Sequence, residues 1–162
     1  MIRDHKRPRD SLHVRNPRVD YYAWKMDQTQ EIMDKLLTQS AAGVPVIVEG
    51  RRDEEALRRL GLKGPVHCLK ASGLSRFEFL DRLNGSNDAI LLTDFDREGR
   101  ELTLWLYKEL SHRGIKSDFT LWRRFRSLSR TEIRSVQELP SFMRALEARS
   151  LGHRTIGPQH PR

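Results

Sequence analysis

Three carboxylates close together in the sequence are the residues best suited to chemistry. Asp94, Asp96 and Glu98 follow the continuously apolar residues 89–92, and Gly99 stands directly after them. Acids this close repel one another, and their hard oxygen ligands suit Mg2+, which binds a few carboxylates together with substrate phosphates. The alternative is an acidic helix start, which the helix dipole stabilises without any metal. For an isolated Asp-x-Asp this alternative is the more common one, so the surrounding sequence has to decide.

A second apolar segment upstream ends in the same way. Residues 44–48 are apolar, Glu49 and Gly50 follow them, and residues 53–60 have the pattern of a helix. A continuous apolar run before a helix is typical of a strand covered on both faces of a parallel sheet. The carboxyl ends of neighbouring parallel strands open onto one crevice. If these two strands are neighbours, Glu49 faces the same crevice as the three acids.

Together the two segments resemble the signature of the Toprim domain, which topoisomerases, primases, some nucleases and repair proteins share. The matching residues read Val-Ile-Val-Glu-Gly-x-x-Asp from residue 46 and Thr-Asp-x-Asp-x-x-Gly from residue 93. The resemblance covers residues 44–125, and residues 94–100 are most similar to the version in type IA topoisomerases. The whole chain is similar to the small stand-alone Toprim proteins of archaea and bacteria, some of which resemble the 5S ribosomal RNA maturase.

The resemblance implies a role for each acid. In Toprim domains the residue matching Glu49 acts as a general acid or base, and those matching Asp94 and Asp96 are metal ligands. The third acid, here Glu98, assists in topoisomerases. We therefore predict that Glu49, Asp94 and Asp96 are catalytic and that the cofactor is Mg2+, with Mn2+ as the alternative metal. The predicted metal ligands are Asp94, Asp96, Glu98 and Glu49, and the predicted structural loop residues are Gly50 and Gly99.

Arginines occur next to the acids and again in residues 118–125, which we predict to form a fourth strand. Arginines beside the acids could clamp the scissile phosphate, and surface ion pairs are the equal alternative. In the predicted strand they are interleaved with aromatic residues, which favours either contact with bases and phosphates or an edge strand protected by charge. The predicted phosphate-binding or nucleic-acid-binding residues are Arg51, Arg52, Arg97, Arg100, Arg123, Arg124 and Arg126.

Positive charge is concentrated in the last third of the chain. The 162 residues carry a net charge of +8, and residues 113–162 hold 11 Lys/Arg against 4 Asp/Glu. Residues 43–112, which contain the acids, hold 11 Lys/Arg against 12 Asp/Glu. A nearly neutral acidic core with a basic extension suits an enzyme that acts on a polyanion. Solubility alone is the other explanation of a basic chain. Together with the acidic motif, the charge favours nucleic acid, either RNA or DNA, as partner.

Strands that alternate with helices at short connections predict an α/β fold. We expect a Toprim, Rossmann-like domain of about four mainly parallel strands with helices on both faces. The predicted organisation is a basic flexible arm over residues 1–22, an accessory helix over 23–43, the Toprim domain with its C-terminal helices over 44–149, and a disordered tail over 150–162. Short helices are also expected at 131–136 and 140–148.

Several classes of protein are disfavoured. No apolar stretch approaches the roughly 18 to 20 residues of a membrane span, and the start lacks a signal peptide, so we expect a cytoplasmic protein without membrane contact. Cys68 is the single cysteine, which excludes an internal disulfide and disfavours a zinc site. The chain has no room for the domain that carries a topoisomerase's nucleophilic tyrosine, and no primase zinc domain is visible.

Two functions remain after these exclusions. The first is a Mg2+-dependent nuclease or phosphoryl-transfer enzyme that acts on RNA or DNA, for example in processing structured or ribosomal RNA or in DNA repair. The alternative is a non-catalytic module that binds nucleic acid or associates with a ribonucleoprotein or another protein complex. The acids Glu49, Asp94 and Asp96 and the intact Gly99 favour the enzyme.

Overall fold

A short parallel sheet organises the part of the chain that the computed structural model describes, residues 17–151. Its strands, all parallel to one another, stand in the order β2-β1-β3-β4. They are β1 (Val46–Val48), β2 (Val66–Cys68), β3 (Asp88–Leu91) and β4 (Lys116–Asp118). The expected arrangement of four strands is confirmed.

The register of the two central strands places the acids at one edge of the sheet. Ile47 of β1 lies opposite Leu91 of β3, and every residue of β1 is buried. Because both strands run in the same direction, the chain leaves them at the same end of the sheet. Glu49 and Asp94 therefore follow neighbouring strand ends, as a shared crevice requires.

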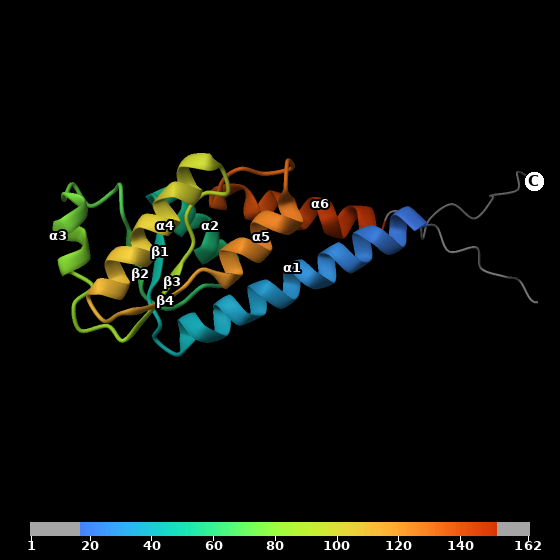
Figure 1. Cartoon of the computed structure of the whole chain (residues 1–162). Helices are drawn as coiled ribbons and strands as arrows, with labels where there is room; N and C mark the ends of the chain where they lie inside the picture. Colours follow the sequence, from blue (N-terminus) through green and yellow to red (C-terminus); the bar gives the residue numbers. More distant parts are fainter. Residues whose placement is uncertain (1–16, 152–162) are drawn as a thin grey trace, which may run out of the picture.

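Helices cover both faces of the sheet, because alternate strand residues point to opposite sides. On one face Val46, Val48 and Ile90 pack into a core with α1, α2, α5 and α6; on the other, Ile47 and Leu91 pack against α3 and α4 (Figure 1). The helices are α1 (Pro17–Ala41), α2 (Arg51–Arg59), α3 (Arg76–Asp81), α4 (Arg97–His112), α5 (Thr120–Ser129) and α6 (Leu139–Leu151). The expected layers are thus confirmed.

The N-terminal helix is longer than the sequence predicted. Helix α1 begins at Pro17 rather than at residue 23, so the last part of the predicted arm is helical. Proline suits the first turn of a helix, where its missing N–H would have no partner. Helix α1 packs along α6 and α5 (Figure 1). The rest of the predicted arm and nearly all of the predicted tail lie outside the described residues.

The strand predicted at residues 118–125 is wrong. Strand β4 ends at Asp118, whose Oδ1 accepts a hydrogen bond from the N–H of Thr120, and helix α5 starts there. Leu121 and Phe125, four residues apart, are buried on one face of this helix. This helical spacing overrides the mixture of arginine and aromatic residues that indicated a strand.

The short helix predicted at residues 131–136 is also wrong. A loop follows α5, and a 3-10 turn, η1 (Val136–Glu138), leads into α6. The helix predicted at 140–148 does exist, as α6. Among residues 17–151, no helix is both long and apolar enough to cross a membrane.

Candidate functional site

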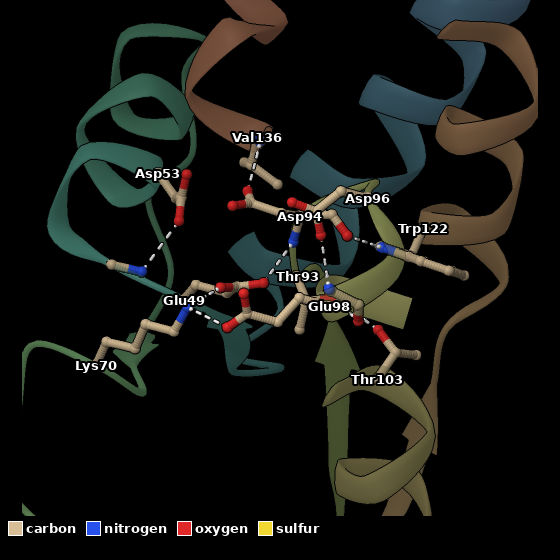
Figure 2. Close-up of polar contacts among 12 residues, drawn as sticks. Glu49, Asp53, Lys70, Thr93, Asp94, Asp96, Glu98, Thr103, Trp122 and Val136 are labelled. Carbon is tan, nitrogen blue, oxygen red and sulfur yellow. Dashed lines mark hydrogen bonds and ion pairs between the residues drawn. The ribbon is translucent and has the colours of Figure 1, made fainter. Parts of the chain in front are cut away.

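Glu49 connects the ends of the two central strands. One carboxylate oxygen, Oε1, accepts a hydrogen bond from the backbone N–H of Asp94 at 3.1 Å, and Oε2 lies 2.6 Å from the ammonium of Lys70 (Figure 2). Only 5% of Glu49 is exposed to solvent. The side chain is therefore held in one orientation at the carboxyl end of β1, with a carboxylate that a partner can reach only from this edge.

Lys70 brings the end of a third strand to the same place. Its backbone N–H donates to the carbonyl oxygen of Glu49 at 2.7 Å just beyond β2, and its ammonium also lies 3.2 Å from Oε1 of Glu98 (Figure 2). The hydrogen bond with Glu49 is the largest cause that raises the pKa of Lys70 to about 12. A positive charge thus bridges two of the predicted metal ligands. We had not predicted Lys70, although its position after an apolar strand matches that of Glu49.

Asp94 lies half-buried among other acids. Its Oδ1 accepts a hydrogen bond from the N–H of Val136 at 3.1 Å. Burial raises the pKa of Asp94 from 3.8 to about 7, and the charges of Asp53, Glu49 and Asp96 add to the effect. Negative charge is therefore concentrated at this edge of the sheet.

Asp53 is a further buried acid of the site that we had not predicted. It is 5% exposed, near the start of α2, and accepts hydrogen bonds from the N–H of Gly50 at 3.0 Å and of Gln137 at 3.1 Å. Burial raises its pKa, although these two bonds oppose the shift, and the charge of Glu49 adds to it. The signal was present, because Asp53 is the last residue of the first matched segment.

Asp96 and Gly99 shape the start of α4. Oδ1 of Asp96 caps the helix by accepting from the N–H of Gly99 at 2.8 Å. A Cβ atom at position 99 would lie 1.9 Å from the carbonyl oxygen of Asp94, so only glycine fits. Buried Thr93 ties the loop to this helix, because its hydroxyl lies 2.7 Å from the carbonyl oxygen of Gly99 and 2.6 Å from the hydroxyl of Thr103. Gly50 is different: the nearest atom to a Cβ there would be 4.0 Å away.

Residues of α5 and of the segment that follows it hydrogen-bond to residues 92–96, the acidic loop between β3 and α4. The indole N–H of Trp122 donates to the carbonyl oxygen of Asp94 at 3.1 Å, and Nε of Arg126 donates to that of Phe95 at 3.1 Å. The N–H of Phe95 in turn donates to the carbonyl oxygen of Arg134 at 2.8 Å. With the bond from the N–H of Val136 to Asp94, residues outside the β-sheet therefore set the position of the acidic loop.

The predicted arginines are distributed over different surfaces. Arg51 and Arg52 lie exposed at the start of α2, and Arg97 pairs with Glu101 along α4 at 3.1 Å. Arg124 turns toward α1 and pairs with Glu31 at 3.4 Å. The exposed Arg100 is near the acids in sequence, whereas Arg123 and Arg126 share a hollow beside the acidic loop.

The predicted metal ligands approach one another without forming a ready-made site. Within the described residues, no three His, Cys, Asp or Glu side chains are arranged to hold a metal ion. Asp96 instead caps α4, and Lys70 pairs with Glu49 and Glu98. The chemistry of the donors nevertheless fits Mg2+, because all are carboxylate oxygens and a cation, the ammonium of Lys70, already lies between two of them.

Comparisons with known proteins agree with this geometry. The model of the Toprim domain family matches residues 43–120. A UPF0292 protein of Methanosarcina barkeri is 29% identical over 133 residues, which are 82% of this chain and 92% of that protein. A UPF0292 protein of Thermococcus kodakarensis is 35% identical over 109 residues, 67% of this chain and 78% of that protein.

A solved structure supports the same assignment. The structure of a protein from Aquifex aeolicus superposes with a TM-score of 0.57 at 28% identity, covering 67% of this chain and 95% of that one. The matched Toprim segment contains the two strand ends that carry Glu49 and Asp94. The chain therefore belongs to the UPF0292 family, and its residues 43–120 form a Toprim domain.

Proposed function

We propose that this protein is a Mg2+-dependent enzyme that breaks or transfers phosphodiester bonds in RNA or DNA. The observation that carries the proposal is the position of Glu49, a buried carboxylate that is hydrogen-bonded to the backbone of Asp94 and to Lys70. A buried carboxylate that pairs with a cation, beside other acids at the carboxyl edge of a parallel sheet, is suited to binding a phosphate through a metal ion.

Each residue has a distinct task in this proposal. Asp94, Asp96 and Glu98 would hold Mg2+, which when bound supplies a Lewis acid that neutralises charge on the phosphate. Glu49 would hold or move the proton at the attacking or leaving oxygen through its carboxylate. Lys70 supports Glu49 in the free enzyme and could turn its ammonium toward a bound phosphate, because 53% of its side chain is exposed. The basic C-terminal third would hold the rest of the polyanion.

The test is to separate cleavage from binding with Glu49→Gln. This change removes the proton-transfer group but keeps the shape of the side chain, so binding should persist while cleavage falls by roughly two to four orders of magnitude. Cleavage of structured RNA, single strands and duplex DNA would be measured with Mg2+ and with EDTA. The matched control is Glu55→Gln, an exposed acid on the neighbouring helix α2.

A non-catalytic module that binds nucleic acid or a ribonucleoprotein is the second candidate. It is favoured by the ammonium of Lys70 between Glu49 and Glu98, and by the lack of three convergent metal ligands among residues 17–151. The same assay decides between the two. Tight binding without Mg2+-dependent cleavage of any of these substrates would show that the protein is the binding module and not the enzyme.

A further inference from the structure

A hollow of about 440 Å3 lies directly beside the acidic loop. It is lined by Phe95, Arg123, Arg126, Ser127 and Arg130. Phe95 is the residue between Asp94 and Asp96 in the chain, and its carbonyl oxygen accepts the hydrogen bond from Nε of Arg126. One wall of the hollow is thus the loop that carries the predicted metal ligands.

The three arginines of the hollow carry uncompensated charge. Arg123, Arg126 and Arg130 follow one another at helical spacing along α5 and its end, and none forms an ion pair within the described part of the chain. Arg124 on the same helix does form one, with Glu31. An anion that enters the hollow would therefore contact three guanidinium groups without first breaking an ion pair with a carboxylate.

Aromatic rings hold two of these guanidinium groups. Arg123 lies over the ring of Phe119 at 5.6 Å, and Arg126 lies over the ring of Trp122 at 5.7 Å. A guanidinium stacked on a ring keeps its N–H edges available for a bidentate contact with phosphate. The hydroxyl of Ser127 is a further donor in the lining. The hollow therefore has both the charge and the donors for a phosphate group.

The backbone of Arg130 is strained. Its φ of 41° and ψ of −102° make it the one non-glycine residue with positive φ among residues 17–151. Helices commonly end at such a position with glycine, because a Cβ atom makes this conformation costly. Strain of this kind is concentrated at functional sites. Arginine at this position places a third guanidinium at the hollow, but it leaves the backbone at the end of the helix strained.

We propose that this hollow binds a backbone phosphate of the nucleic-acid strand whose scissile phosphate lies at the acids. The inference rests on the proposed function and adds how the substrate is positioned. Because the hollow and the acids share the loop around Phe95, a phosphate held by the arginines fixes which phosphodiester of the same strand reaches Glu49 and Asp94. The enzyme then needs a substrate that extends past the scissile bond on the side of α5.

The binding test compares two charge-matched double variants. Arg123→Ser with Arg130→Gly removes two charges from the hollow and spares Arg126, which also supports the loop. Arg59→Ser with Arg144→Ser removes two exposed charges from α2 and α6. Fluorescence anisotropy with single-stranded and hairpin RNA and with single-stranded and duplex DNA would give affinity at several salt concentrations.

The hollow variant should bind roughly tenfold or more weakly at about 0.1 M salt and flatten the plot of log affinity against log salt by up to about two units. The control variant should change both quantities much less. Equal losses in the two variants would overturn the hollow as a phosphate site and leave general electrostatic attraction, with the proposed function intact. A wild-type protein that binds none of these probes would overturn both proposals.

Arg130→Gly alone provides an independent measurement. Glycine adopts the observed backbone without strain, so the melting temperature should rise by about 2 °C. Affinity for the nucleic-acid probe should fall at the same time, because a guanidinium is lost. A variant that binds as tightly as the wild type would contradict the proposal, whatever its melting temperature.

Discussion

The ammonium of Lys70 lies 2.6 Å from Oε2 of Glu49. The same nitrogen lies 3.2 Å from Oε1 of Glu98, so a side chain from the segment after β2 joins the acids that follow β1 and β3. The protein thereby carries a cation of its own at the acidic edge. Any metal ion that uses Glu49 or Glu98 must compete with this ammonium.

Lys70→Met should therefore raise the affinity for metal and lower the stability of the metal-free protein. Loss of the ammonium leaves buried Glu49 with one hydrogen bond fewer, which should lower the free energy of unfolding by about 1 to 3 kcal/mol in EDTA. The affinity for Mg2+ should rise roughly fivefold, or about 1 kcal/mol. Calorimetric titration with Mg2+ and urea unfolding measure the two effects. Lys63→Met, at an exposed lysine, is the control, and weaker Mg2+ binding in Lys70→Met would disprove competition.

Mg2+ or Mn2+ should stabilise the folded protein through Asp94 and Asp96. A ligand that binds only the folded state adds about 2.7 kcal/mol when its free concentration is 100 times its Kd. The double variant Asp94→Asn, Asp96→Asn should lose this gain, measured as the metal-induced rise in melting temperature. Asp27→Asn with Asp88→Asn removes two exposed acids elsewhere and should keep it. The same rise in both double variants would place the metal at another site.

The pKa of Asp94 predicts how stability depends on pH in EDTA. A folded-state pKa of about 7 against the ordinary value of 3.8 favours the neutral carboxyl in the folded protein. This contribution is fully present below about pH 4 and is lost as the pH rises through 7. At pH 8 Asp94→Asn should therefore be more stable than the wild type, by about 1 kcal/mol after allowance for solvent screening.

That advantage should shrink as the pH falls to 5, and urea unfolding at both values measures it. The pKa of Asp53 is also raised, so the variant should keep part of the decline in stability that accompanies rising pH. Asparagine can still accept the hydrogen bond from Val136. If Asp94→Asn were less stable than the wild type at pH 8, the ionised carboxylate would be stabilising rather than costly.

Substitution by alanine should change the stability of the protein very differently at the two predicted loop glycines. Gly99→Ala forces a methyl group toward the carbonyl oxygen of Asp94, so α4 or the loop must move, at about 3 kcal/mol. Gly50→Ala meets open space at a φ of −146° and should cost less than about 1 kcal/mol. Chemical denaturation of both variants is the measurement. A cost for Gly50→Ala as large as that for Gly99→Ala would mean that the loop after β1 is also closely packed.

The strands and the acids after them were predictable because apolar runs and charged residues differ sharply in the sequence. The pattern around Glu49 and Asp94 predicted two strands that each end in an acid, and the structure shows that these two strands are neighbours, which the sequence left as a condition. Helix α5 was misinterpreted because Arg123 and Arg124 stand between Trp122 and Phe125, a mixture of charged and aromatic residues that also suits an edge strand. Only the packing of Leu121 and Phe125 against the sheet and neighbouring helices decides for a helix.

The contacts that hold the acids in place could not be predicted from the sequence. Val136 and Gln137 donate through their backbone N–H groups, so their side chains give no sign of the role. The ion pair of Lys70 joins residues 21 and 28 positions away in the chain, and many lysines form no such pair. The hollow beside Phe95 likewise depends on where the end of α5 lies relative to the acidic loop.

The backbone donor of Val136 has a consequence for the protein during its synthesis. The ribosome adds Asp94 42 residues before Val136, an interval of roughly 2 to 8 seconds at 5 to 20 residues per second. Once residue 120 has been added, the nascent chain contains the whole matched Toprim segment, residues 43–120, but still lacks the N–H groups that orient Asp94 and Asp53. The acids therefore reach their final arrangement only after residues 136 and 137 have been added to the chain.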